Sequence, residues 1–255
     1  MRNIALTISY DGTDFIGWQK QPDTEGRTVQ AEVEKALSLL HKTQITINGS
    51  GRTDSGVHAI CQVANFLSPI DSIPVEKYAY AINGFLPRDI RIHKVEEKDT
   101  NFHARFSATS RSYRYFFHFG SVSPFAHDMK YVWWLRYKPN IENLNAMANC
   151  LIGEIDCMSF ASICDKSLST YRAIKKAHFF MDGEKLVFEI QANAFLWKMV
   201  RTIVATLIEL DRKKLTKKEF QAIIDAKNRK KAAATAPAAG LFLWNINFDG
   251  ERRHP

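Results

Sequence analysis

Asp54 is the side chain whose setting in the sequence best suits chemistry. It lies between Gly51 and Gly56 and follows Arg52 by two residues. Glycines permit left-handed backbone angles and let a ligand approach the main chain closely, while a nearby arginine keeps a carboxylate ionised and can grip a phosphate. The loop can therefore present a charged carboxylate to a ligand. The spacing equally suits a tight hairpin with an Asx turn at Asp54, and spacing alone does not choose between the two.

Three common ligand-binding loops do not fit this segment. A dinucleotide fingerprint that begins at Gly49 would need a third small residue at position 54, where the chain has an aspartate. A phosphate-binding loop would need a lysine after its second glycine, where the chain has Val57. A calcium loop that begins at Asn48 would need a glutamate at its twelfth position, which is Ala59. The segment is therefore none of these.

The charge of the chain indicates an anionic partner. Of its 255 residues, 35 are Lys or Arg and 27 are Asp or Glu, which gives a formal net charge of +8. Residues 209–231 hold nine basic and four acidic side chains. A basic surface attracts nucleic acid, anionic membrane or acidic proteins, although such a run also suits a solvated helix face.

Cysteine usage and hydropathy indicate the compartment. The four cysteines form no CxxC pair and have no spacing with histidine that suggests a zinc site. The N-terminus has no apolar signal core, and no run of about 18 apolar residues suggests a membrane span. We therefore expect free thiols, a cytoplasmic location, and neither a metal nor a membrane partner.

The first half of the chain predicts an α/β unit that holds the Asp54 loop. Ile4, Leu6, Ile8 and Tyr10 alternate as in a half-buried strand, and apolar residues from Val29 onward recur at helical spacing. The other predicted elements are strands at 44–48, 58–67 and 90–95 and a helix at 74–84. The loop is thus expected between two strands.

The second half repeats this scheme after a polar stretch at residues 97–110. Tyr113, Tyr115 and Phe117 alternate as in a strand, so their side chains are expected on one face. The other predicted elements are helices at 141–151, 195–208 and 216–227 and extended segments at 171–181, 185–192 and 241–248. We predict an α+β fold of two pseudo-duplicated α/β domains, 1–104 and 105–255, with mainly antiparallel sheets and the active site in the cleft between them.

Seven segments, in order along nearly the whole chain, resemble one known family. The most specific is Gly51 to Ala59, which reads GRTDSGVHA. The others are 10–13 with 17–19 (YDGT and GWQ), 83–89 (NGFLPRD), 102–108 (FHARFSA), 113–115 (YRY), 193–196 leading into 199–201 (NAFL and MVR), and 238–241 (AAGL). Together they are similar to the tRNA pseudouridine synthase A family, whose members isomerise uridine in tRNA.

The resemblance implies a role for each matching site residue. Asp54 matches the catalytic aspartate that is required to break the bond between base and ribose. Arg52 matches an arginine that helps to hold the target nucleotide out of the stack, and Tyr113 matches a tyrosine that contacts the substrate. Arg201 matches an arginine that pairs with the aspartate, and Leu241 resembles an apolar wall of the uracil pocket.

The resemblance also implies a substrate and a mechanism. The expected substrate is uridine at positions 38 to 40 in the anticodon arm of tRNA, and the expected assembly is a homodimer that holds each RNA across both subunits. The isomerisation involves no redox change and consumes no water, so no cofactor is expected. Asp54 can attack the sugar, attack C6 of the base or remove a ribose proton, and the sequence leaves these open. Ser55 and Ala205 depart from the common family pattern, and neither has a role in this chemistry.

Two other classes of protein share some of these features. One is a non-catalytic RNA-binding protein with the same fold and charge, in which replacing Asp54 by asparagine would leave tRNA modification unchanged. The other is a hydrolase of free nucleosides, which would need a second carboxylate or a metal cluster near Asp54. No motif in the sequence supplies that partner.

Overall fold

The computed structural model describes residues 1–21 and 25–251, which form two compact units. The first unit contains residues 1–109 and 242–250, and the second contains residues 110–241 with residue 251. The domains predicted from the sequence, 1–104 and 105–255, differ because the end of the chain returns to the first unit. There it adds a strand beside β3 (His58–Ser68). Residues 252–255 of the second predicted domain lie outside the described residues.

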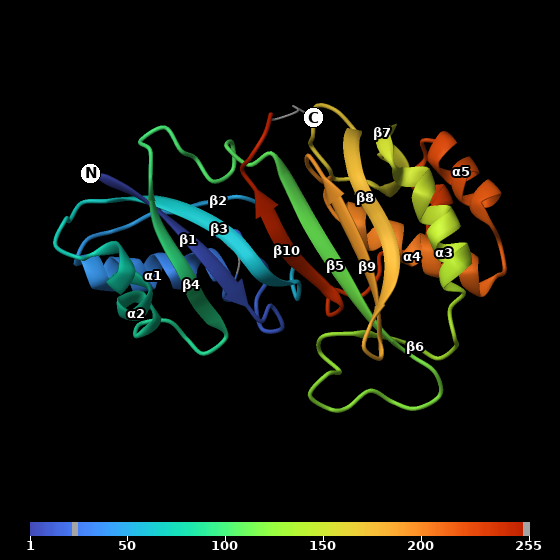
Figure 1. The fold of residues 1–255 in the computed structure, drawn as a ribbon, viewed down its shortest axis with the longest axis horizontal. Coiled ribbons are helices and arrows are strands. Elements are labelled where there is room, and N and C mark those ends of the chain that lie inside the picture. Colours follow the sequence, from blue (N-terminus) through green and yellow to red (C-terminus); the bar gives the residue numbers. More distant parts are fainter. Residues whose placement is uncertain (22–24, 252–255) are drawn as a thin grey trace. The chain divides into compact units, whose positions relative to one another are not determined.

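The sheet of the first unit is mostly antiparallel (Figure 1). β1 runs antiparallel to both of its neighbours, β3 and β4, and residues 242 and 243 of β10 pair with β3 in parallel. The short β2 adds to β3 in antiparallel fashion. Ile4, Leu6 and Ile8 are fully buried, as the alternation in β1 predicts. The other strand bounds are β1 (Arg2–Tyr10), β2 (Asn48–Gly49), β4 (Ile90–Lys98) and β10 (Leu241–Asn247).

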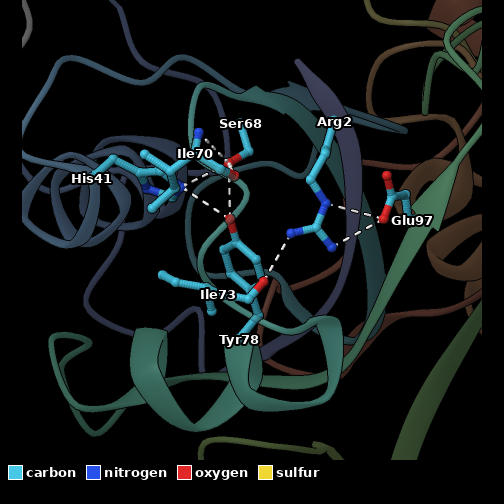
Figure 2. Close-up of polar contacts among 7 residues, drawn as sticks. All are labelled: Arg2, His41, Ser68, Ile70, Ile73, Tyr78 and Glu97. Carbon is cyan, nitrogen blue, oxygen red and sulfur yellow. Dashed lines mark hydrogen bonds and ion pairs between the residues drawn. The ribbon is translucent and has the colours of Figure 1, made fainter.

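Two helices, α1 (Val29–His41) and α2 (Val75–Asn83), cover one face of this sheet (Figure 1). His41 at the end of α1 and Tyr78 in α2 both pack on Phe66 of β3, with ring centroids 5.5 and 6.4 Å apart. The Ser68 hydroxyl oxygen lies within hydrogen-bond distance of both groups, 3.2 Å from Nε2 of His41 and 2.8 Å from the Tyr78 hydroxyl oxygen (Figure 2). This buried polar network fastens both helices to the end of β3.

The strand predicted at residues 44–48 is largely absent. Only Asn48 belongs to a strand, β2. The main-chain amide of Ile45 donates to the Ser38 hydroxyl at 2.9 Å, and that of Ile47 donates to the Glu34 carboxylate at 3.2 Å. Because side chains of α1 satisfy these amides, the segment follows the helix instead of joining the sheet.

The main strands of the second unit pair in antiparallel fashion. β9 lies between β5 and β8, β7 pairs with the far edge of β8, and β6 adds to β5 in parallel. Phe117, Phe179 and Phe188 on three adjacent strands form the aromatic centre of its core, each at most 3% exposed. The strand bounds are β5 (Ser110–Phe119), β6 (Trp133–Leu135), β7 (Gly153–Asp156), β8 (Tyr171–Asp182) and β9 (Lys185–Ala192).

Three helices accompany this sheet: α3 (Ile141–Ala148), α4 (Met199–Arg212) and α5 (Lys217–Asp225). The amide side chain of Asn145 in α3 makes two hydrogen bonds to the main chain of Phe179, which fixes α3 to β8. The predicted helix 195–208 begins later, at Met199, because Lys198 adopts a left-handed conformation with φ of 61°. The mixed α/β class and the mainly antiparallel sheets agree with the prediction. No helix in the described part of the chain is long and apolar enough to cross a membrane.

Candidate active site

The segment around Gly17 supports the loop that carries Asp54. The backbone of Gly17 forms a β-bridge with Asp54, and the Trp18 amide donates to the Thr53 carbonyl at 3.1 Å. The same segment accepts a hydrogen bond from the first turn of α1, where the Val29 amide donates to the Gly17 carbonyl at 3.2 Å. The loop is thus tied through one extended segment to the start of a helix.

Two glycines allow this close packing. Gly17 has a φ of 124°, and a Cβ there would lie 2.7 Å from the Thr53 carbonyl oxygen. At Gly49 a Cβ would lie 2.4 Å from the indole nitrogen of Trp18. Of the glycines that flank Asp54, Gly56 has a positive φ of 75°, whereas Gly51 has open space around it. Glycine is therefore required at 17 and 49, outside the segment 51–56, and also at Gly12, where a Cβ would lie 2.0 Å from the Val57 carbonyl oxygen.

The main chain closes the turn after Asp54. The Val57 amide donates to the Asp54 carbonyl at 3.2 Å, so a main-chain hydrogen bond closes this turn. Asp54 is half-buried and Arg52 is exposed. A carboxylate that is partly exposed on a fixed backbone can contact a ligand.

Buried polar side chains hold the start of the loop. Gln62 of β3 is fully buried, and its amide donates to the Gly51 carbonyl at 2.9 Å. Its carbonyl oxygen accepts from the Ser50 hydroxyl at 2.7 Å. The Tyr10 and Thr53 hydroxyl oxygens are 2.8 Å apart. Spacing in the sequence gave no sign of these supports, because each joins the loop to a residue outside its motif.

In the second unit, the other predicted site residues have well-defined surroundings. Tyr113 of β5 is 8% exposed, and its ring packs edge-on against Phe195 with centroids 5.0 Å apart. The Nε of Arg201 in α4 donates to the Ala236 carbonyl at 2.8 Å. Leu241, at the start of β10, is 5% exposed. Tyr113 therefore presents a fixed ring, and Arg201 holds the segment that leads towards Leu241.

Tyr115 reinforces the same segment. Its hydroxyl donates to the Pro237 carbonyl at 2.7 Å. Burial raises the pKa of this hydroxyl, while the positive charge of Arg201 acts in the opposite direction. The group therefore stays protonated and remains a hydrogen-bond donor at neutral pH. A Cβ at Gly240 would lie 2.4 Å from the Tyr115 ring, so the 236–240 segment packs closely on β5.

The predicted site residues fall into two sets. Asp54 and Arg52 belong to the first unit, whereas Tyr113, Arg201 and Leu241 belong to the second. Within the described residues, no group of three His, Cys, Asp or Glu side chains is placed to hold a metal ion.

Comparison with known proteins identifies the family. Residues 6–107 and 147–249 match the family described as tRNA pseudouridine synthase. A Treponema denticola protein named tRNA pseudouridine synthase A is 53% identical over 251 residues, which cover 97% of this chain and 93% of the relative. The chain belongs to the tRNA pseudouridine synthase family. The family match includes the whole loop from Asn48 to His58.

Other relatives in this family are similar over their full length. The Brachyspira hyodysenteriae protein of the same name is 44% identical across 98% of this chain and all of the relative. The Bacillus subtilis protein is 41% identical across 96% of this chain and 99% of the relative. A solved Cbf5-Nop10-Gar1 complex matches 80% of this chain and 53% of that chain at 9% identity, with a TM-score of 0.33, which is too low to support an argument.

Proposed function

We propose that this protein isomerises uridine to pseudouridine in tRNA and that Asp54 is the catalytic carboxylate. The observation that carries the proposal is the family match, which spans most of the chain and includes the Asp54 loop. The three relatives from Treponema denticola, Brachyspira hyodysenteriae and Bacillus subtilis are each similar to at least 96% of this chain. A half-buried carboxylate on a loop with a fixed main chain agrees with this role.

The reaction rearranges bonds and leaves the composition of the RNA unchanged. The C1′–N1 bond breaks, the uracil turns, and a C1′–C5 bond forms. The hydrogen leaves C5 as a proton, and N1 gains one, so atoms and electrons balance. Asp54 can assist by attacking C1′, by attacking C6 or by removing a ribose proton. Each route requires the ionised carboxylate close to an extruded nucleotide.

The remaining site residues are proposed to complete the same active site. Arg52 is proposed to hold the flipped nucleotide and Tyr113 to contact the uracil, where stacking on an aromatic ring contributes about 1–3 kcal/mol per base. Arg201 is proposed to pair with Asp54, and Leu241 to form an apolar wall. In this view the chain consists of two pseudo-duplicated domains with the active site in the cleft between them.

The substrate and assembly follow from the family resemblance. The proposed targets are uridines 38 to 40 in the anticodon arm of tRNA, and the proposed enzyme is a cytoplasmic homodimer. The basic side chains of α5 and of the short 3-10 turn at Arg229–Lys231 are candidates for contacts with RNA phosphates. Binding through these groups is expected to weaken as salt concentration rises.

The test compares wild type, Asp54→Asn and Asp71→Asn on unmodified tRNA transcripts. Asp71 is exposed in the same unit, so its variant makes the same charge change away from the loop. Pseudouridine is mapped by reverse-transcription stops after carbodiimide treatment. We expect stops at 38 to 40 with wild type and Asp71→Asn and none with Asp54→Asn. Equal stops from all three proteins would refute the role of Asp54.

A further inference from the structure

The side chain of Tyr10 reaches from the end of β1 into the loop that carries Asp54. Its hydroxyl lies 2.8 Å from that of Thr53, the residue before the carboxylate. Tyr10 is 4% exposed and Thr53 is 8% exposed, so water cannot readily replace this hydrogen bond. A buried hydroxyl that loses its partner keeps the cost of its desolvation. The pair is therefore a strong constraint on the conformation of Thr53.

The main chain of Tyr10 provides a rigid base for this contact. Tyr10 lies opposite Ala59 on β3 and Ile90 on β4, so both neighbouring strands hold it in register. Its ring lies beside that of Trp18, with centroids 6.0 Å apart. The hydroxyl consequently projects from the middle of a sheet and not from a mobile loop.

Thr53 is held at two of its atoms, the hydroxyl oxygen and the carbonyl oxygen. The Thr53 carbonyl accepts from the Trp18 amide at 3.1 Å, and the same oxygen lies against Gly17. Adjacent side chains of an extended backbone point to opposite sides. Asp54 forms a β-bridge with Gly17, so with the Thr53 side chain fixed towards Tyr10 we expect the Asp54 side chain on the opposite side.

We propose that Tyr10 is a positioning residue for catalysis: its hydroxyl fixes Thr53 and thereby aims the Asp54 carboxylate at the target nucleotide. This inference rests on the proposed role of Asp54. Displacing a reacting group by about 1 Å can cost on the order of 100-fold in rate. Tyr10 touches neither the substrate nor the reacting atoms in this account, and it acts through Thr53.

The structure offers a matched control in Tyr78. This tyrosine is also buried in the first unit, and its hydroxyl also joins a polar network, 2.8 Å from the Ser68 hydroxyl (Figure 2). Tyr10→Phe and Tyr78→Phe therefore remove the same atom from similar surroundings. The difference is that the Tyr78 network fastens helices, whereas the Tyr10 contact fastens the Asp54 loop.

The experiment measures kcat and KM on a tRNA transcript, together with the thermal unfolding midpoint. We expect Tyr10→Phe to lower kcat by about 10- to 100-fold with KM for tRNA changed by less than about threefold. We expect Tyr78→Phe to lower the thermal unfolding midpoint at least as much as Tyr10→Phe does, and to leave kcat unchanged. The proposal is overturned if Tyr10→Phe keeps the wild-type kcat, or if both variants lose activity equally.

A second pair keeps the test valid should Tyr10→Phe fail to fold. Thr53→Val retains the shape of the side chain without its hydroxyl, and Thr53→Ser retains the hydroxyl. We expect Thr53→Val to reproduce the fall in kcat and Thr53→Ser to recover most of it. Combining Tyr10→Phe with Thr53→Val should cost little more than either change alone, since both break one contact. Fully additive losses would contradict the proposal.

Asp54→Asn, assayed in parallel, separates the positioning role of Tyr10 from the catalytic role of Asp54. If Asp54→Asn is inactive while Tyr10→Phe has full activity, the positioning role fails and the proposed function stands. If Asp54→Asn is active, the proposed catalytic role of Asp54 fails and the positioning role fails with it, whereas absence of activity in wild type would refute the proposed function itself.

Discussion

The two ends of β3 carry two polar clusters that look alike and serve different purposes. At its start, Gln62 and the Tyr10–Thr53 pair hold an irregular loop rich in glycine. At its end, Ser68 joins His41 and Tyr78 and fastens two helices (Figure 2). Both clusters satisfy buried polar groups, but only the first holds the loop that carries Asp54. A buried polar network is therefore informative about function only through the group that it orients.

The largest difference between the two ends is expected at their glycines. Gly17→Ala would force a left-handed φ of 124° on alanine and place its Cβ 2.7 Å from the Thr53 carbonyl. We expect a fall of about 2 kcal/mol in the free energy of unfolding and a loss of about 100-fold in kcat. Gly84→Ala, near the helix end of the unit, meets only ordinary contact at 3.4 Å. Urea denaturation and tRNA assays should show that Gly84→Ala has nearly the stability and kcat of wild type. Losses equal to those of Gly17→Ala would contradict the proposed difference between the two ends.

Gln62→Glu should make the loop end sensitive to pH. The protonated carboxyl can donate to Gly51 as the amide does, whereas the carboxylate would face its carbonyl oxygen. Burial and this carbonyl raise the pKa of the introduced carboxyl in the folded protein, so its stability is fully present below the unfolded pKa of about 4.3. That stability is lost as pH rises. Unfolding midpoints between about pH 4 and 8 should diverge from wild type towards high pH.

The control for this change is Gln44→Glu at an exposed position of the same unit. It introduces the same charge and should follow wild type at every pH. A flat difference between Gln62→Glu and wild type across the range would mean that the Gly51 contact contributes little to the loop.

Ser68→Ala should weaken the helix end without affecting catalysis. The change removes the hydroxyl that donates to the Ile70 carbonyl at 3.0 Å and meets both His41 and Tyr78. We expect the free energy of unfolding to fall by about 1–3 kcal/mol with kcat unchanged at temperatures where the variant is folded. A fall in kcat measured on the folded variant would show that the two clusters are coupled.

The smallest effect is expected at the ion pair near the helix end. The carboxylate of Glu97 accepts from Arg2 at 3.0 and 3.1 Å, and its side chain is 47% exposed (Figure 2). Exposed ion pairs of this kind contribute little in water. Glu97→Gln should therefore leave the thermal unfolding midpoint and the activity nearly unchanged. A clear drop in the midpoint would show that this pair belongs with the buried network.

Sequence periodicity predicted elements that frame the loop, because Ile4, Leu6 and Ile8 alternate in β1 and apolar residues recur at helical spacing in α1, as their burial requires. It did not predict that side chains of α1 would capture the amides at 45 and 47. The importance of Asp54 came from the resemblance of its motif, since spacing alone left a structural turn open. Tyr10 lies in one of the segments that resemble the family, but the contacts of Tyr10 and Gln62 with the loop were not predicted, because contacts between distant segments have no period in the sequence.

The most direct test of the central claim follows the proton that leaves C5 of the uridine. Transcripts with tritium at C5 are mixed with excess enzyme, and tritium release is timed in a single turnover, with tRNA binding measured separately. The account predicts that Asp54→Asn binds tRNA like wild type and releases tritium about 10³-fold more slowly or not at all, while Asp71→Asn matches wild type. Release by Asp54→Asn at the wild-type rate would contradict it.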